Sequence, residues 1–531
     1  MEKRLVLAVA MSILIIVGFQ FLAKPVQRVQ PCVPTCPETV ATNVSVPGVK
    51  SEPINDIPKV LLPESVKVVD NDLYAIEFSD VGGAIKHISL KKFNETTAPT
   101  PFCLANISDQ SDYIGKLTFS GLGENSNKEK FLAENSDGGI MYRLKSGSAE
   151  ITKKYSLLKD KYGIGLNVQV KNTGAEPINF DYRITAGAGV DEANKQDKRL
   201  VEISAKVNGK TVGFKQPRDA KISNMGEVEW TALKNKYFSL ILKPFAKTIS
   251  QFYSISRDGY LVNGVDAGLV TVLPGETMEH KYLIYAGPSD IEKLKQVGYG
   301  LDETVNYGVF APISKFIIVV MKFFYSIVHS WGISILLLSI FLNVLTFPLT
   351  MKSFKSMQKM QELHPQMEKL KVQYKGNPQK LNQEMMALYK TYKINPLSGC
   401  LPMLLQMPIF FALYQALMKS IELRCTKFLW IKDLSMPDAV PIPFTLPLIG
   451  NSINILPLVM VAAMVVQQKM STKTMGAAVT PEQREQQKMM LIVMPIMFGF
   501  IFYNMPSGLV LYWVTNTVLT IVEQSAVLKK D

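Results

Sequence analysis

GISILLLSIFLNVLTFPL, residues 332–349, is an uncharged run of 18 residues. That is about the length of helix that crosses the hydrocarbon core of a bilayer. Four polar side chains in and just after this run fall at i, i+4, i+7 and i+11 and would share one stripe of a helix: Ser339, Asn343, Thr346 and Thr350. Because an unpaired hydroxyl or amide is costly in lipid, the stripe is expected to face protein or a hydrated cavity.

A second uncharged stretch, residues 397–418, lies beyond a polar segment that is rich in lysine. Pro402 and Pro408 interrupt this stretch, and Gln406 stands between the two prolines. Polar groups inside a membrane usually face protein or a water-filled cavity rather than lipid. Two spans that carry such groups, on either side of one basic segment, therefore predict a groove within the membrane.

The basic segment, residues 351–396, is predicted to be a hairpin of two helices. Pro365 should kink or restart the first arm. Gly376 should end that arm, and Asn377 with Pro378 should cap and begin the return arm. Nine lysines against three glutamates place the hairpin in the cytoplasm by the positive-inside rule. Direct reading of RNA by these lysines is the less favoured interpretation.

Each arm of the hairpin carries apolar side chains at three- and four-residue spacing, so the two arms should pack face to face. Flexible methionines suit a surface that accepts many apolar partners, although methionine also simply fills gaps between helices. The hairpin residues predicted to contact clients or the ribosome are Lys352, Met357, Met360, Met385 and Tyr389.

Three groups of residues resemble the YidC/Oxa family of membrane protein insertases. The first joins TFPLT at 346–350 to QEMMALYK at 383–390. The second joins NPLSGCLP at 395–402 to QMPIF at 406–410, and the third is PSGLVLYW at 506–513. These motifs make the resemblance specific from about Tyr307 onward, whereas the preceding part of the chain matches in topology only.

The resemblance implies a polytopic α-helical membrane protein with six transmembrane helices, five of them in a conserved insertase core, and a large periplasmic antiparallel β-sandwich domain. It implies an insertase and chaperone that inserts and helps fold newly made inner-membrane proteins, alone or with the Sec translocon, through a hydrated groove. The implied partners are nascent membrane proteins, the Sec translocon with its accessory subunits, the ribosome and membrane lipids. Specific nucleic-acid readout is not expected.

The first half of the chain is predicted to hold an anchor, a linker and the β domain. Residues 1–23 join a basic start to an uncharged run, which favours an uncleaved signal-anchor transmembrane helix over a cleavable signal peptide. Residues 24–55 are polar and proline-rich, as extended linkers are. Residues 56–290 show short alternating runs between Gly, Asn and Asp turns, which predict strands. The family resemblance implies a β-supersandwich similar to sugar-binding folds, but no residue marks a sugar site, so we interpret the domain as a scaffold or docking surface.

The remaining segments follow from the apolar runs and the loops between them. Lys315 and Lys322 are seven residues apart on one face, which favours an amphipathic helix at the membrane interface for residues 311–328 over a further span. The other predicted segments are transmembrane helices at 332–350, 397–419, 453–468, 489–503 and 508–528, a periplasmic loop at 420–452 and a cytoplasmic loop at 469–488. Both chain termini are then cytoplasmic, and the protein is a multi-pass protein of the inner membrane.

The last predicted helix has a polar stripe of its own. Trp513, Asn516 and Thr520 stand at i, i+3 and i+7. The residues predicted to line the groove are Ser339, Asn343, Gln406, Tyr512, Trp513 and Asn516. Hydrogen bonding between helices explains the same residues equally well when the resemblance is set aside. The resemblance implies an arginine where Asn343 stands, so this groove is expected to act through hydration and hydrogen bonding.

Composition limits the chemistry of this 531-residue chain. Its net charge of +13 fits basic loops beside apolar spans. The five cysteines make no disulfide framework, and Cys32 and Cys36 lack the second ligand pair of a zinc site. The four histidines are far apart, and neither a Walker A motif nor G-x-S-x-G occurs. No enzymatic activity, metal or cofactor is therefore predicted.

Two functions from other classes compete with insertion. A secondary transporter with a periplasmic binding domain would usually show inverted repeats and charged residues within its spans, and we expect neither here. A structural protein that anchors an outer β domain would not need polar stripes in its spans. Insertion is therefore the preferred function.

Overall fold

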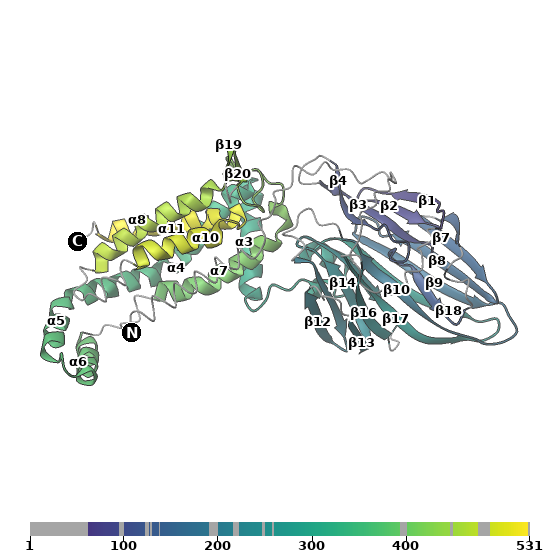
Figure 1. Ribbon diagram of the computed structural model, residues 1–531, viewed down its shortest axis with the longest axis horizontal. Coiled ribbons are helices and arrows are strands. Elements are labelled where there is room, and N and C mark those ends of the chain that lie inside the picture. Colours follow the sequence, from purple (N-terminus) through teal and green to yellow (C-terminus); the bar gives the residue numbers. More distant parts are fainter. Residues whose placement is uncertain are drawn as a thin grey trace, which may run out of the picture. The chain divides into compact units, whose positions relative to one another are not determined.

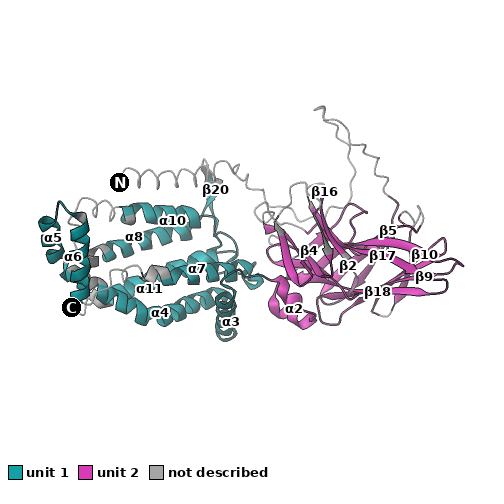
Figure 2. Ribbon diagram, turned by 90° about the horizontal axis from the view of Figure 1, so that it is seen from below, with its two compact units in different colours: residues 1–28, 306–531 teal, residues 29–305 magenta. Residues whose placement is uncertain are grey.

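The computed structural model describes residues 62–94, 100–122, 127, 130–136, 138–190, 200–215, 222–246, 250–257, 260–392, 401–446, 450–475 and 489–528. These residues belong to two compact units, which divide between Val305 and Asn306 (Figure 2). The predicted anchor at 1–23, the linker at 24–55 and most of the predicted cytoplasmic loop at 469–488 lie outside the described residues.

The β-sheet unit, which is unit 2 in Figure 2, is built from three antiparallel sheets (Figure 1). A four-stranded sheet has the order β1 (Val66–Asp70), β2 (Tyr74–Ser79), β3 (Ala84–Asn94) and β4 (Pro101–Asn106). A five-stranded sheet has the order β13 (Ile222–Gly226), β16 (Ser250–Arg257), β17 (Tyr260–Val272), β10 (Ile178–Ala188) and β5 (Leu117–Ser120).

The third sheet has nine strands, in the order β12 (Lys210–Lys215), β11 (Glu202–Val207), β14 (Val228–Lys234), β15 (Phe238–Pro244), β18 (Thr277–Pro288), β9 (Gly163–Asn172), β8 (Ala149–Leu157), β7 (Gly139–Ser146) and β6 (Leu132–Ser136). A short helix, α2 (Ile291–Val297), and the 3-10 turn η2 (Leu301–Thr304) follow the last strand. In β9 buried and half-buried side chains alternate, because successive residues of a strand face opposite sides of the sheet.

Buried hydrogen bonds join both smaller sheets to the nine-stranded sheet. Asn263 of β17 donates to Thr231 Oγ1 of β14 at 2.7 Å, and both side chains are fully buried. Tyr74 of β2 donates from its hydroxyl to the carbonyl of Ala286 in β18 at 2.7 Å. The predicted antiparallel β domain is confirmed, and its layers form a sandwich.

Lys153 of β8 fastens two turns to the nine-stranded sheet. Its side chain is fully buried, and its Nζ donates to the carbonyls of Gly82, Gly83 and Gly115 at 2.7, 2.6 and 2.7 Å. Gly83 and Gly115 have φ angles of +50° and +77°, a conformation that L side chains rarely adopt. The lysine thus donates hydrogen bonds to turn carbonyls in place of the backbone N–H of a neighbouring strand.

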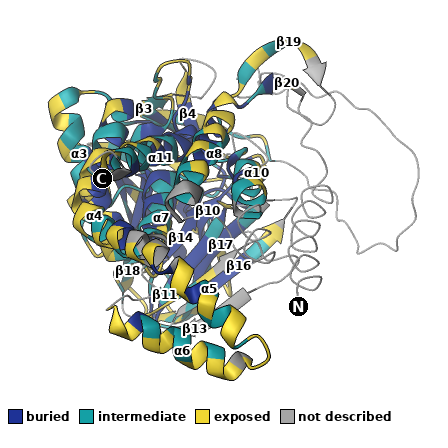
Figure 3. Ribbon diagram, turned by 90° about the vertical axis from the view of Figure 1, so that its left-hand side faces the viewer, coloured by how far each residue is buried: buried dark blue, intermediate teal, exposed yellow. Residues whose placement is uncertain are grey.

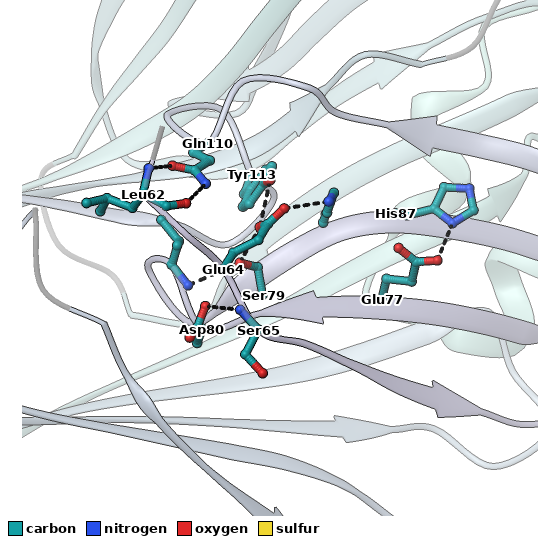
Figure 4. Close-up of polar contacts among 11 residues, drawn as sticks. Leu62, Glu64, Ser65, Glu77, Ser79, Asp80, His87, Gln110 and Tyr113 are labelled. Atoms are coloured by element: carbon teal, nitrogen blue, oxygen red, sulfur yellow. Dashed lines mark hydrogen bonds and ion pairs between the residues drawn. The ribbon is translucent and has the colours of Figure 1, made fainter. Parts of the chain in front are cut away.

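Polar side chains also fix the first described residues of the domain (Figure 4). Gln110 bonds the backbone of Leu62 in both directions, accepting from its N–H at 3.0 Å and donating to its carbonyl at 2.7 Å. Glu64 accepts from the hydroxyls of Ser79 and Tyr113 at 2.7 and 3.0 Å. The segment before β1 is therefore held although it belongs to no strand.

The other unit, which is unit 1 in Figure 2, is helical. Its elements are α3 (Ala311–Val328), α4 (Trp331–Glu362), α5 (His364–Gln373), α6 (Pro378–Thr391), α7 (Leu401–Lys419), the 3-10 turn η4 (Ile421–Leu423), the strands β19 (Val440–Leu446) and β20 (Gly450–Ile453), α8 (Ile455–Met475), the π-turn η5 (Met489–Val493), α10 (Met494–Phe502) and α11 (Ser507–Leu528). A buried apolar cluster holds α3, α4, α7, α8, α10 and α11 together and includes Ile317, Leu338, Leu413, Met460 and Leu509.

Several predicted boundaries differ from the observed ones. The span predicted at 332–350 and the first part of the hairpin are one continuous helix, α4, which runs through Pro348. The loop predicted at 420–452 contains η4 and the β19–β20 hairpin. The span predicted at 489–503 is a π-turn followed by α10. Main-chain hydrogen bonding decides these bounds, and apolar composition alone does not mark where it changes.

The predicted start signals of the hairpin helices are confirmed. Pro365 stands in the first turn of α5, and Pro378 stands in the first turn of α6. The side chain of Asn377 accepts from the backbone N–H of Lys380 at 3.1 Å and so caps α6. Most side chains of α5 and α6 are exposed or half-buried (Figure 3).

The described helices do not establish six spans. By length and composition alone, Ala311–Val328 and Trp331–Ser356 are long and apolar enough to cross a membrane. The apolar helices Ile455–Ser471 and Leu491–Phe502 are shorter. Ala311–Val328 is the segment that we predict to lie at the membrane interface. Its length and composition fit both an interfacial helix and a membrane span.

Candidate functional site

Asn343 of α4 and Asn516 of α11 meet across the two helices. The Nδ2 of Asn343 donates to the Oδ1 of Asn516 at 3.1 Å, and only 8% of Asn343 is exposed. Ile335 and Gly508 also face one another, since a Cβ built on Gly508 would lie 3.3 Å from Ile335 Cδ1. Both pairs have the same difference in residue number (516 − 343 = 508 − 335 = 173), so α4 and α11 run parallel in one register.

A second polar pair joins α11 to α7. The Nε2 of Gln406 donates to the hydroxyl of Tyr512 at 3.2 Å, and Tyr512 is 1% exposed. Tyr512 lies four residues before Asn516, so both side chains occupy one side of α11. The structure therefore brings together four of the six predicted groove residues, with α11 in contact with both partner helices.

The polar stripe of α4 continues past Asn343 along the same helix face. Thr346 and Thr350 are half-buried, and each donates its hydroxyl to a carbonyl one turn earlier, at 3.0 and 3.1 Å. Thr520 of α11 is half-buried and donates to the carbonyl of Asn516 at 2.8 Å. We call Asn343, Thr346, Thr350, Asn516 and Thr520 the α4–α11 seam.

The other two predicted groove residues lie elsewhere. Ser339 is fully buried, and its hydroxyl donates to the carbonyl of Ile335 at 2.7 Å, so it is satisfied inside its own helix. Trp513 packs among aromatic rings, with centroids 5.4 Å from Phe410, 5.7 Å from Phe498 and 5.2 Å from Phe502. Trp513 therefore packs α11 against α7 and α10.

The two hairpin helices are joined by a small apolar cluster of their own. Leu363, Met367 and Tyr389 are buried, and Met385 packs against them. The hydroxyl of Tyr389 lies 3.7 Å from the sulfur of Met367. Among the other predicted hairpin residues, Lys352 is exposed, and the side chains of Met357 and Met360 lie outside the described part of the chain.

Comparison with known proteins covers both units. A family model described as "YidC periplasmic domain" matches residues 67–320, and one described as "60Kd inner membrane protein" matches residues 323–531. A protein of Geotalea daltonii named "Membrane protein insertase YidC" is 34% identical over 556 residues, which cover 100% of this chain and 99% of that protein. The chain belongs to the YidC family.

A second relative gives a similar result. A relative from Geobacter sp. (strain M21), also named "Membrane protein insertase YidC", is 36% identical over 478 residues, which cover 86% of this chain and 84% of the relative. The solved structure described as "Active YidC insertase crystal structure with the first transmembrane domain resolved" aligns with 88% of this chain and 93% of its own, at 17% identity and a TM-score of 0.36.

Membership of the YidC family confirms the predicted combination of a helical membrane core and a periplasmic β-rich domain. The chain combines a helical core with a periplasmic β-rich domain, and YidC proteins are non-enzymatic insertases of the inner membrane. Among the described residues, no group of three or more His, Cys, Asp or Glu side chains could hold a metal ion.

Two polar residues of α11 were missed by the sequence analysis. Gln524 donates to the hydroxyl of Ser471 in α8 at 3.1 Å. Glu523 is half-buried and is the one charged residue in the sequence of α11, so the expectation that the spans hold no charge is wrong for the predicted span 508–528. Glu523 follows Asn516 by seven residues, and this helical spacing is the sequence signal that places it on the same face.

Proposed function

We propose that this chain is a membrane protein insertase and chaperone for newly made inner-membrane proteins. The observation that carries the proposal is the placement of polar side chains on α11, which bonds to α4 through Asn516 and to α7 through Tyr512. Family membership supplies the activity, because relatives 34% identical over their whole length are named membrane protein insertases.

The seam can lower the barrier to insertion without an energy source in the protein. A polar client segment loses its hydration when it enters lipid, and each unpaired polar group costs several kcal/mol there. Amides and hydroxyls of the seam can replace part of that hydration. Hydrogen bonds between membrane helices contribute only about 1 kcal/mol each, so a client group can exchange with the Asn343–Asn516 contact. The apolar part of the client then moves out into lipid.

The α5–α6 hairpin is proposed to lie in the cytoplasm, with both chain termini on the same side and six helices that span the membrane. The excess of lysine between residues 351 and 396 supports this orientation. Because α4 runs without a break into the hairpin, a nascent chain that contacts the hairpin would be close to the cytoplasmic end of the seam. The ribosome, the Sec translocon with its accessory subunits and the surrounding lipids are its proposed partners.

Purified full-length protein in liposomes tests the activity. The client is a small single-span protein with a short translocated tail, and protease protection of that tail measures insertion. Insertion well above that of protein-free liposomes is expected. Liposomes that hold the folded protein and insert no more client than empty ones would contradict the proposal.

A further inference from the structure

Glu523 is the one charged side chain in α11, and it is half-buried. It follows Asn516 by seven residues, which is close to two helical turns, so the two side chains lie on the same face of α11. Gln524, the next residue, faces α8 instead, where it bonds to Ser471. Glu523 is therefore directed toward the side of α11 that meets α4.

The register of the two helices places Glu523 along the seam. Residues of α4 and α11 face one another at a difference of 173, so Glu523 is level with Thr350 (523 − 350 = 173). At a rise of about 1.5 Å per residue, seven residues separate it from Asn516 by roughly 10 Å along the axis. Glu523 thus stands at the end of the seam nearest the α5–α6 hairpin.

Among the residues whose side chains the structure describes, no cation forms an ion pair with Glu523. Lys352 and Lys355 on α4 and Lys469 on α8 are exposed, and none of the ion pairs found among the described residues includes Glu523. The remaining seam side chains are amides and hydroxyls, which carry no charge. An ionisable residue within a membrane helix is by default a functional candidate, because its burial is costly unless it has a partner.

We propose that Glu523 binds the positively charged side chain that flanks the cytoplasmic end of a client span. This inference rests on the proposed insertase function and names the client feature that the seam recognises. Client spans keep Lys and Arg on the cytoplasmic side, which is the side proposed for the hairpin end of the seam. A carboxylate there holds a basic flank while the polar segment ahead of it crosses, and it repels an acidic flank.

The test uses two single-span clients that differ only at the cytoplasmic flank, with two lysines in one and two glutamines in the other. Both are offered to liposomes that contain wild-type protein, Glu523→Gln or Glu523→Lys. A half-exposed ion pair contributes up to about 1 kcal/mol, or roughly fivefold. Wild type should therefore insert the lysine client about threefold to fivefold better. Glu523→Gln should remove this preference, and Glu523→Lys should reverse it.

Glu276→Gln is the matched control, because it removes one exposed carboxylate from the turn between β17 and β18, outside the helical unit, and should keep the preference for the lysine client. Insertion of the glutamine client by Glu523→Gln at the wild-type rate shows that the variant is folded and active. An unchanged preference in Glu523→Gln would overturn the assignment of Glu523 and leave the insertase function standing. Failure of wild type to insert either client would overturn the proposed function itself.

Discussion

The side-chain amide of Asn343 donates to that of Asn516 at 3.1 Å, across two parallel helices that are 173 residues apart in the chain. Both residues are amides, so the contact has donors and acceptors on each side and no net charge. The two side chains together have two carbonyl and two NH2 groups. A client group can therefore replace one of these four groups in the contact, and no uncompensated charge remains. This property separates the pair from a buried ion pair, whose disruption leaves an uncompensated charge.

Substitutions at Asn343 should show whether its side chain hydrogen-bonds to the client or only packs α4 against α11. Asn343→Leu removes the donor to Asn516 and should reduce insertion several-fold for clients with neutral and with acidic leaders alike. Asn343→Arg keeps a donor and adds a positive charge, so it should be tolerated and should favour acidic leaders. Insertion of both clients by the two variants in liposomes measures this. If the leucine variant matches the parent, Asn343 only packs α4 against α11.

The Gln406–Tyr512 contact should stabilise the packing of α7 against α11. Tyr512→Phe leaves the Nε2 of Gln406 without its partner and should lower thermal stability in detergent by an amount equivalent to about 1 kcal/mol. Tyr414→Phe is the matched control, because that hydroxyl has no hydrogen-bond partner among the described residues and its loss should change little. Equal effects of the two substitutions would show that the contact contributes nothing specific.

Removal of the hairpin helices should separate folding from insertion. The hairpin has its own cluster around Met367 and Tyr389, apart from the core that joins α3, α4, α7, α8, α10 and α11. A deletion of residues 363–392 keeps Phe354, which is 6% exposed in α4, and should leave a stable membrane-embedded protein with little insertase activity. Normal growth of a depletion strain that carries the deletion would show that the hairpin contacts neither client nor ribosome.

Lys153 should make the stability of the β domain depend on pH. Burial, followed by the nearby charge of Lys116, lowers the pKa of Lys153 in the folded state. The unfolded chain then binds the proton more strongly, so stability rises with pH from the folded-state pKa up to the ordinary value of about 10.4. Hydrogen exchange of β8 peptides in the full-length protein should show this rise in wild type and not in Lys153→Met.

Lys153→Met should also lower the stability of the domain at neutral pH. Gly82 and Gly115 lose a donor to their buried carbonyls, whereas the carbonyl of Gly83 keeps the hydroxyl of Tyr155 at 2.9 Å. We expect a loss of about 3 kcal/mol from the two carbonyls without a partner. Lys145→Met, at an exposed position of β7, is the control. Equal exchange rates in the two variants would contradict a structural role for Lys153.

The sequence predicts the polar contacts of the seam only in part. The spacing of Asn343 and Asn516 places each on a stripe of its own helix, because periodicity determines which side chains share a face. Periodicity does not show which hydroxyls the helix satisfies by itself. Ser339 belongs to the same stripe, yet its hydroxyl bonds to the carbonyl of Ile335 one turn earlier. The sequence likewise does not show the register between α4 and α11, because these helices are distant in the chain.

The fold of each unit was also predictable only in part. Alternation of apolar and polar residues indicates strands, and Asn377 with Pro378 indicates the start of α6, because both depend on local geometry. The three-sheet arrangement and the role of Lys153 depend on contacts such as that with Gly82, 71 residues away. A lysine in a strand gives no sequence signal that it will be buried against carbonyls.

The central claim is that the seam is the route of the client, and photo-crosslinking from α11 tests it most directly. A photoreactive amino acid replaces Asn516 in one variant and Val518, which is 46% exposed and lies on another face of α11, in a second. Each variant meets a client that is stalled with its polar segment half-inserted. We predict that position 516 crosslinks to the polar segment and that position 518 crosslinks to lipid. Crosslinks to the client from position 518 with none from position 516 would contradict the account.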